Sequence, residues 1–328
     1  MRVLVLGAAG FIGRNLVKAL RAGGTLRVRG RKEQRIVELV LADFRPVPPV
    51  AVPDGIVIRV EQGDICDPSF LPRLFDGDFD CVFHLAATLT LDAEMDFARG
   101  LDVNVHALMR LLEHCRAQAR PPSLVFASSI SAYGGALPEV VDDDVVQTPQ
   151  TSYGCHKAIA ELLISDCSRR GFVDGRVLRL PIVLTHPGPS SASVSDRIAA
   201  LIREPLNGRD AVCPLDPRTR FPVASARSVV RGLLALLALP ADVFGATRAM
   251  NLPSLTVTPA AIEAAVVRAH TGGRLGATAW QPDEQMQGIV QAWPREFTSR
   301  RALERGIVGD ASIDAIVAAY VEDDLAHG

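Results

Sequence analysis

Two residues able to carry proton chemistry, Tyr153 and Lys157, lie one helical turn apart at the start of a segment with helical apolar periodicity. On a helix this spacing puts both side chains on one face. An ammonium beside a phenol favours the phenolate, which predicts a Tyr153 pKa below the ordinary value of about 10. Such a tyrosine can serve as the general base of hydride transfer. A surface Tyr and Lys paired by chance give the same spacing, so the pattern gains meaning only beside a nucleotide site.

A glycine-rich turn near the N-terminus predicts that nucleotide site. Residues 2–6 have the pattern of a buried strand, and an amphipathic helix follows the turn. Between a strand and a helix, Gly7 permits a tight turn, Gly10 lets the backbone approach a pyrophosphate, and Gly13 lets helix and strand pack closely. A glycine-rich turn without a ligand is the alternative, and it fits the start of an α/β chain less well. The residues of this turn predicted to bind the cofactor are Gly7, Gly10, Phe11, Ile12 and Gly13.

An acid at the end of the second predicted strand, residues 36–43, indicates which dinucleotide binds. The carboxylate of Asp43 can accept both hydroxyls of an adenosine ribose and repels a 2′-phosphate, which favours NAD over NADP. The gap from Gly13 is about ten residues longer than the usual ~20. Because Arg14 and Arg45 lie close by in the sequence, NADP stays open as the less favoured cofactor.

Three further polar residues follow in the next predicted elements. Asp64 comes after a third strand at residues 56–60 and can accept from an adenine amino group, although a solvated turn aspartate is equally compatible. Residues 80–87 form a fourth strand, in which His84 is predicted to be a satisfied core histidine. Asn104 lies between two valines in a long helical region and is predicted to be a buried polar clasp.

The order of strands and helices predicts the fold class. A fifth strand, residues 123–129, ends in two serines, and a sixth spans residues 176–183 after the Tyr153 helix. Strands that alternate with helices on this scale form a right-handed parallel sheet covered on both faces. The chain is therefore predicted to be an α/β protein with a Rossmann-type doubly wound parallel sheet.

The sequence also predicts a second, smaller lobe. After about residue 184 the rhythm changes to short strands and helices of mixed α/β type, and the helix over residues 225–239 is predicted to return to the sheet. The predicted nucleotide-binding domain comprises residues 1–184, with 225–253 returning to it. The predicted C-terminal substrate lobe comprises residues 185–224 and 254–328.

These motifs, in this order, resemble the extended short-chain dehydrogenase/reductase family, also described as the NAD-dependent epimerase/dehydratase family. The resemblance implies a Rossmann fold, a bound nicotinamide cofactor and a Ser/Tyr/Lys site. It implies that Ser129 hydrogen-bonds the reacting hydroxyl, Tyr153 takes its proton, and Lys157 binds the nicotinamide ribose and lowers the tyrosine pKa. The further cofactor contacts expected from this reading are Ile65, Leu85, Ala86, Ala87, Asn104, Pro181 and Ile182.

The chain departs from the nucleotide-sugar epimerases and dehydratases that make up most of this family. Their Arg-x-x-Asn after the sixth strand is replaced by residues 179–182, Arg-Leu-Pro-Ile, and their Asp-containing segment before the late helix by residues 221–228. Both changes weaken the case for a uridine diphosphate group. Segments around residues 168–172, 203–206 and 321–325 are instead similar to family members that oxidise the C2 hydroxyl of a four-carbon sugar acid, D-erythronate, with NAD.

A small polyhydroxy carboxylate needs a cation, and Arg227 and Arg220 lie in the segment that lines the substrate side of this fold. Ordinary surface arginines are the alternative, at least as good for Arg220. A sugar-acid dehydrogenase is the predicted function. A nucleotide-sugar epimerase comes second, and a non-catalytic NAD-binding regulator third, because a regulator has no need of the Ser129, Tyr153 and Lys157 set.

Composition excludes other classes of function. With 328 residues, 48% hydrophobic, 22% charged and a formal net charge of −2, the chain has no general attraction for nucleic acid or anionic membranes. No signal peptide or membrane span is predicted. The six cysteines lack metal-ligand spacing, so no metal site is predicted, and reduced thiols favour a cytoplasmic location. A homodimer is expected through helices near 92–118 and 151–170, as is common in the family.

Overall fold

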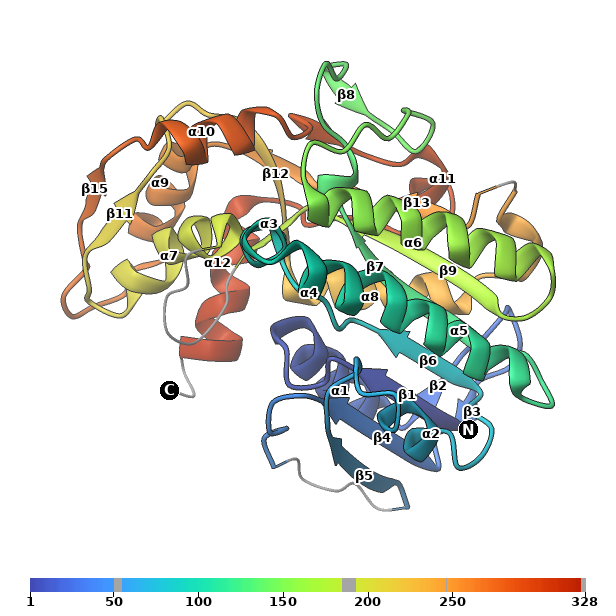
Figure 1. The fold of residues 1–328 in the computed structure, drawn as a ribbon. Helices are drawn as coiled ribbons and strands as arrows, with labels where there is room; N and C mark the ends of the chain where they lie inside the picture. The colour runs from blue at the N-terminus through green and yellow to red at the C-terminus, as the bar shows by residue number, and fades with distance from the viewer. Residues whose placement is uncertain (50–54, 185–192, 246, 326–328) are drawn as a thin grey trace. The chain divides into compact units, whose positions relative to one another are not determined.

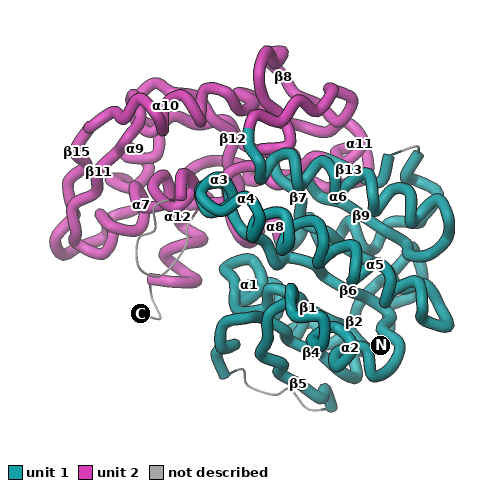
Figure 2. Tube along the Cα trace, viewed as in Figure 1, with its two compact units in different colours: residues 1–129, 151–179, 230–250 teal, residues 130–150, 180–229, 251–328 magenta. Residues whose placement is uncertain are grey.

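The computed structural model describes residues 1–49, 55–184, 193–245 and 247–325, which form two compact units (Figure 2). The first unit contains residues 1–129, 151–179 and 230–250, and the second contains 130–150, 180–229 and 251–328. Residues 130–150 thus lie with the second unit, whereas the sequence placed them in the nucleotide-binding domain. Residues 185–192, the start of the predicted substrate lobe, lie outside the described residues.

A seven-stranded sheet forms the centre of the first unit, in the order β13-β9-β7-β6-β1-β4-β5 (Figure 1). The chain runs outward from β1 in one direction and then restarts beside β1 in the other, which is the doubly wound topology. The predicted parallel Rossmann-type sheet is therefore confirmed. Its strands are β1 (Arg2–Leu6), β4 (Glu38–Asp43), β5 (Val57–Gln62), β6 (Cys81–His84), β7 (Ser123–Ser129), β9 (Asp174–Leu180) and β13 (Ala249–Asn251).

Helices cover both faces of this sheet. Figure 1 shows α5 and α6 on the near face and α1 and α8 on the far face. On one face Leu4, Val82 and Phe126 pack with the apolar residues of α2, α5 and α6. The helices of this unit are α1 (Phe11–Gly23), α2 (Phe70–Leu74), α3 (Thr90–Met95), α4 (Phe97–Leu101), the π-helical turn η1 (Asp102–His106), α5 (Ala107–Ala117), α6 (Ser152–Arg169), most of α8 (Ala226–Ala238) and the short η3 (Ala241–Val243).

Strand register brings the predicted site residues to one edge of the sheet. Leu6 at the end of β1 pairs in register with Ala42 of β4 and with His84 of β6, and His84 pairs with Phe126 of β7. The residues that follow these positions therefore share the carboxyl edge. Open parallel sheets bind their ligands at this edge, beside the strand where the order reverses.

The predicted sixth strand is two strands in the structure. β9 ends at Leu180, and β10 (Ile182–Leu184) begins after Pro181 and pairs with β12 of the second unit. Pro181 has no N–H to donate to a ladder, so the chain changes sheets there.

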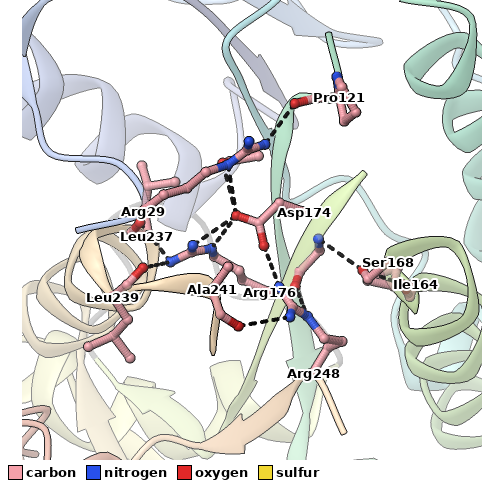
Figure 3. A network of polar contacts seen from close by, with 12 residues as sticks. Arg29, Pro121, Ile164, Ser168, Asp174, Arg176, Leu237, Leu239, Ala241 and Arg248 are labelled. Atoms are coloured by element: carbon pink, nitrogen blue, oxygen red, sulfur yellow. Dashed lines mark hydrogen bonds and ion pairs between the residues drawn. The ribbon is translucent and has the colours of Figure 1, made fainter. Parts of the chain in front are cut away.

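The connector after α1 explains the unusually long gap between Gly13 and Asp43. Short strands β2 (Thr25–Leu26) and β3 (Gln34–Arg35) pair within it, and Arg29 between them adopts a left-handed φ of 55°. Figure 3 shows Arg29, Arg176 and Arg248 around the carboxylate of Asp174. Arg176, fully buried, also donates to three carbonyls at the end of α8, those of Leu236, Leu237 and Leu239. The backbone N–H of Arg29 caps Leu237 as well, so the connector terminates α8.

The second unit is a mixed α/β lobe with its own core. Phe221, Val223, Ile262, Ile316 and Val317 are buried in it. No helix of the described chain is long and apolar enough to cross a membrane. The elements of the second unit are the short η2 (Ile130–Ala132), β8 (Val140–Val141), β10, α7 (Val194–Leu206), β11 (Ala211–Cys213), β12 (Phe221–Ser225), the start of α8, β14 (Leu255–Val257), α9 (Pro259–Ala269), β15 (Thr278–Trp280), α10 (Glu284–Gln291), β16 (Glu296–Phe297), α11 (Arg300–Leu303), α12 (Ile313–Tyr320) and the π-helical η4 (Val321–Leu325).

Candidate active site

Helix α6 presents the tyrosine and lysine at the carboxyl edge of the sheet. Thr151 caps it, its side chain accepting from the N–H of Gly154. Tyr153 and Lys157 follow within the first two turns, and both are buried, with 9% and 3% of their surfaces exposed. The helix therefore directs both side chains into the protein, so the alternative of a surface pair is wrong.

Ser129, at the end of β7, hydrogen-bonds the side chain of Tyr153. Burial raises the pKa of Tyr153 to about 12, and the Ser129 hydrogen bond only partly opposes that rise. The sequence predicted a lowered pKa from the nearby ammonium, and for the ligand-free protein that prediction is wrong. The physical reason is the position of Lys157, whose Nζ lies 5.4 Å from the centre of the Tyr153 ring in an environment that desolvates both groups.

Lys157 itself is held by backbone and aromatic contacts. Its Nζ donates to the carbonyl of Ala127 at 2.8 Å and lies 4.4 Å from the centre of the Phe126 ring. Burial lowers the pKa of Lys157 to about 7, and the charge of Glu161 opposes this shift. The side chain therefore changes charge near neutral pH.

The glycine turn leaves no room for side chains at two of its three glycines. Gly7 has a φ of +87°, and a Cβ there would lie 2.7 Å from the backbone N of Ala86. A Cβ on Gly13 would lie 2.0 Å from the carbonyl O of Gly7, whereas at Gly10 the nearest atom is 3.1 Å away. Gly10 directly precedes α1, whose positive N-terminal end suits a pyrophosphate. The turn therefore fits the dinucleotide that the sequence predicts.

The second acid, Asp43, faces this turn. It is 7% exposed, and its two carboxylate oxygens accept from the N–H groups of Ala9 and Arg45, each at 2.9 Å. Both oxygens keep further lone pairs for ribose hydroxyls. The guanidinium of Arg45 lies 3.7 Å from the same carboxylate and is largely exposed. Asp43 thus fits the ribose site predicted for it.

Asp64, the predicted adenine contact, is fixed by two neighbours. It accepts from the N–H of Cys66 at 2.9 Å and pairs with Arg99 at 2.7 Å. Burial acts to raise the pKa of Asp64, but these two contacts hold it below its ordinary value. Ile65 beside it is buried. The contact between Asp64 and adenine stays a prediction. In that contact Asp64 would act as a carboxylate and not as a neutral acid.

Asn104 forms the buried clasp that the sequence predicts. It lies in η1, and its amide both accepts from the N–H and donates to the carbonyl of Thr88, each at 3.0 Å. This holds the loop that contains Leu85, Ala86 and Ala87. His84 differs from its prediction, because its buried Nδ1 has no hydrogen-bond partner among the described residues. Burial lowers the pKa of His84 to about 3, so the ring is neutral.

The two predicted substrate arginines belong to the second unit, and both are engaged with acids. Arg227, at the start of α8, pairs with Asp323 at 2.5 Å and Glu322 at 3.0 Å. Arg220 pairs with Glu139 and Glu296. Each arginine side chain is 42% exposed. Pro181 and Ile182, the predicted nicotinamide contacts, lie at the junction of β9 and β10 and are buried.

A buried ion pair next to Lys157 was missed from the sequence. Glu161, one turn after Lys157 on α6, pairs with Arg179 of β9, and both are about 95% buried with exposures of 4% and 5%. The signal was present in the sequence as an acid on the face of the helix that carries Tyr153 and Lys157. It was overlooked because an acid in a helix is usually solvated.

Comparison with known proteins decides the family. Residues 3–251 match the model of the NAD dependent epimerase/dehydratase family. The chain belongs to this family. The resemblance seen in the sequence is thereby confirmed, and the family is one that works with NAD.

Family members with named activities cover the whole chain. D-erythronate dehydrogenase of Cupriavidus necator is 43% identical over 323 residues, 98% of each chain. D-erythronate dehydrogenase of Haemophilus influenzae is 33% identical over 99% of this chain and 100% of its own. A crystal structure described as the nucleoside-diphosphate-sugar epimerase from Agrobacterium tumefaciens has a TM-score of 0.90 at 32% identity, covering 100% of this chain and 95% of that one. The chain is an NAD-dependent oxidoreductase on this evidence.

Proposed function

We propose that this protein oxidises the C2 hydroxyl of a small sugar acid, D-erythronate or a close relative, with NAD. The observation that carries the proposal is the 43% identity with a D-erythronate dehydrogenase over 98% of both chains. The likeness extends through the lobe that varies with substrate in this family, and not only through the nucleotide-binding residues.

The residues of α6 and β7 take the catalytic roles in this proposal. Ser129 hydrogen-bonds the C2 hydroxyl and orients it toward Tyr153, and Tyr153 accepts the hydroxyl proton. Lys157 binds the nicotinamide ribose and supplies a positive charge that favours the phenolate. When bound, the nicotinamide accepts the hydride from C2. Proton and hydride leave the same carbinol, so the acid becomes a 2-keto acid and NAD becomes NADH.

The cofactor is held by residues of the first unit. The turn carrying Gly7, Gly10 and Gly13 binds the pyrophosphate, with Phe11 and Ile12 beside it, and Asp43 binds the adenosine ribose. Asp64 and Ile65 bind the adenine half of the cofactor. The backbone of the loop containing Leu85, Ala86 and Ala87 lies against the cofactor. Pro181 and Ile182 pack on the nicotinamide.

The carboxylate of the substrate is held by an arginine, and Arg227 is the first candidate. A guanidinium binds a carboxylate through two parallel hydrogen bonds, which fixes the C2 carbon for reaction. Its ion pairs with Glu322 and Asp323 must be shared or exchanged when substrate binds. Arg220 is the second candidate and has the same kind of acidic partners.

A substrate panel tests this function. Purified protein with NAD is offered D-erythronate, other four-carbon sugar acids, the matching uncharged sugar alcohols and UDP-sugars, and NADH absorbance is followed. Net NADH formation with one or more of the acids is expected. No NADH from any acid, together with product formation from a UDP-sugar, would reject the proposal.

A nucleotide-sugar epimerase is the second candidate, because the Agrobacterium tumefaciens structure carries that description at 32% identity. Epimerases re-reduce their own cofactor, so they do not accumulate NADH. The replaced Asn in residues 179–182 counts against a sugar nucleotide in this chain.

We also infer a homodimer formed through α5 and α6, working in the cytoplasm. Leu162 of α6 is 70% exposed and Met109 of α5 is 48% exposed, which leaves apolar side chains for a second copy. Leu108, Leu111 and Leu112 of α5, by contrast, are buried in the core of the first unit. All six cysteines are free thiols, which suits a reducing compartment.

A further inference from the structure

The missed ion pair has a fixed geometry. Nε and Nη2 of Arg179 donate to the carboxylate of Glu161, with Nε 3.0 Å and Nη2 2.8 Å from Oε2. Oε1 of Glu161 also accepts from the hydroxyl of Ser128 at 2.5 Å. Nε of Arg179 also lies 3.1 Å from Oε1, so the guanidinium donates to both oxygens and the carboxylate cannot rotate without losing a buried hydrogen bond.

Glu161 is the anion that acts on Lys157. The charged or titratable groups of the described chain that influence Lys157 come from three elements. Strand β6 contributes His84, and helix α6 contributes Tyr153, His156 and Glu161. Strand β9 contributes Arg179, which acts on Lys157 through its ion pair with Glu161. Burial lowers the pKa of both histidines, so neither carries a charge at neutral pH. Among the described residues, Glu161 is the charge that opposes the desolvation of the Lys157 ammonium.

We propose that Glu161 and Arg179 are positioning residues that favour the charged form of the Lys157 side chain beside Tyr153. The inference rests on the proposed function only for the catalytic role of Lys157. Arg179 and Ser128 hold the carboxylate of Glu161 in one orientation, and its charge in turn stabilises the Lys157 ammonium. The cluster of Arg179, Glu161 and Lys157 then has one positive charge in excess, and the phenolate of Tyr153 neutralises it. The cluster therefore favours the form of Tyr153 that has lost its proton.

The lysine content of the chain allows a direct test on ligand-free protein. The chain contains three lysines, Lys18, Lys32 and Lys157, and the first two are exposed. Protein labelled with ¹³C at the lysine Cε therefore gives three signals, of which two are internal references. Glu161→Gln keeps the shape of the side chain and removes its charge. We expect it to lower the titration midpoint of Lys157 by about one pH unit or more.

The direction of the shift separates this role from a purely structural one. If the variant merely loosened the packing, water would reach Lys157 and its midpoint would rise toward the ordinary value. An unchanged or raised midpoint in Glu161→Gln overturns the proposal. Since the readout needs neither NAD nor substrate, a wrong substrate assignment leaves it unaffected, and the failure of one proposal is distinguishable from the failure of the other.

Two further variants control for folding. Asp174→Asn removes a buried carboxylate from its pair with Arg176 at the other end of β9, about 16 Å from Arg179 along the strand, and should leave the Lys157 midpoint unchanged. If Glu161→Gln does not fold, Glu161→Gln/Arg179→Gln removes both charges and leaves no buried ion without a partner. Its Lys157 midpoint should fall by less than in Glu161→Gln, because the lost cation of Arg179 acts in the opposite direction, and a raised midpoint there rejects the proposal.

Discussion

Tyr153 lies in a buried site that opposes its ionisation. Its pKa is raised to about 12 because the phenol is buried, and Ser129 supplies the hydrogen bond that partly offsets this. A general base works best with a pKa near the working pH. If Tyr153 is the general base proposed above, the charges of Lys157 and of a bound nicotinamide would have to lower the pKa of the phenol together.

We expect Tyr153→Phe to lower kcat by ~10²-fold or more, because the variant keeps the ring and loses the proton acceptor. NAD binding, measured by titration of the protein fluorescence, should stay close to parental. Lys157→Met, by contrast, should lose both NAD affinity and turnover. A Tyr153→Phe protein with parental kcat would remove the tyrosine from the mechanism.

The buried Lys157 makes stability depend on pH in a defined direction. Its pKa is lowered from 10.5 to about 7 in the folded protein. Between these values the unfolded chain binds a proton here that the folded protein lacks, so this group makes the free energy of unfolding rise with pH. Below about pH 7 both states bind the proton and its contribution no longer changes.

This dependence can be measured against Lys157→Met in chemical unfolding without ligands. The difference in the free energy of unfolding, variant minus parent, should shrink by about 1 kcal/mol or more between about pH 7 and about pH 9. Other titrating groups are common to both proteins and cancel. A difference that stays constant over this range would show that Lys157 keeps an ordinary pKa.

Asp43 should make the enzyme prefer NAD strongly over NADP, because its carboxylate repels a 2′-phosphate. Asp43→Ala should weaken NAD and relieve the exclusion of NADP, as measured by kcat/KM for each cofactor. Because the carboxylate also accepts from the N–H of Ala9, Asp43→Asn is the matched control that keeps an acceptor for this bond. Equal kcat/KM for NAD and NADP in the parent protein would refute the assignment.

At the scale of elements, the start of α8 and the C-terminal segment η4 are linked through one arginine. Ser225, the last residue of β12, directly precedes α8 and is fixed by Asp310, which accepts from both its N–H and its hydroxyl. Arg227, two residues later, reaches Glu322 and Asp323 of η4. The helix thus holds the base of Arg227, while η4 competes with any substrate carboxylate for its guanidinium.

If Arg227 binds the substrate, Arg227→Lys should lower kcat/KM for the acid by ~10-fold or more, since charge-assisted bonds of this kind contribute ~1.5–3 kcal/mol. Arg227→Ala should lower it further, with NAD affinity unchanged in both. Replacing the competitors in Glu322→Gln/Asp323→Asn should lower KM for the acid. Arg227→Ala with parental turnover of erythronate, or an uncharged sugar alcohol that is as good a substrate, would contradict the carboxylate clamp.

At the scale of the whole molecule, the exposed apolar residues of α5 and α6 predict a homodimer, to be measured by light scattering at micromolar protein. Leu162→Glu should give a monomer, because the glutamate would place a charge in the apolar interface. Leu303→Glu, at a leucine of α11 that is 47% exposed, is the control and should stay dimeric. A monomeric parent protein would end the proposal.

The sequence by itself determined the fold class, the cofactor and the family. The patterns behind these predictions are local in the sequence. They are the alternation of strands and helices, the spacing of Gly7, Gly10 and Gly13, and an acid after the second strand. Each of them can be interpreted without knowing the order of the strands in the sheet. The parallel sheet and the edge that gathers these residues follow from such patterns because parallel strands end together. Periodicity likewise located α8, which was predicted over residues 225–239 and spans Ala226–Ala238.

Tertiary structure alone decided what surrounds each side chain. The raised pKa of Tyr153, the lowered pKa of Lys157 and the orphan Nδ1 of His84 all follow from burial, which spacing along a helix does not contain. The pair of Glu161 with Arg179 joins residues 18 positions apart on different elements, so a local pattern could show the acid on the helix face but not its partner. The break at Pro181 was visible in the sequence, but which sheet the chain joins next depends on a partner strand far along the chain.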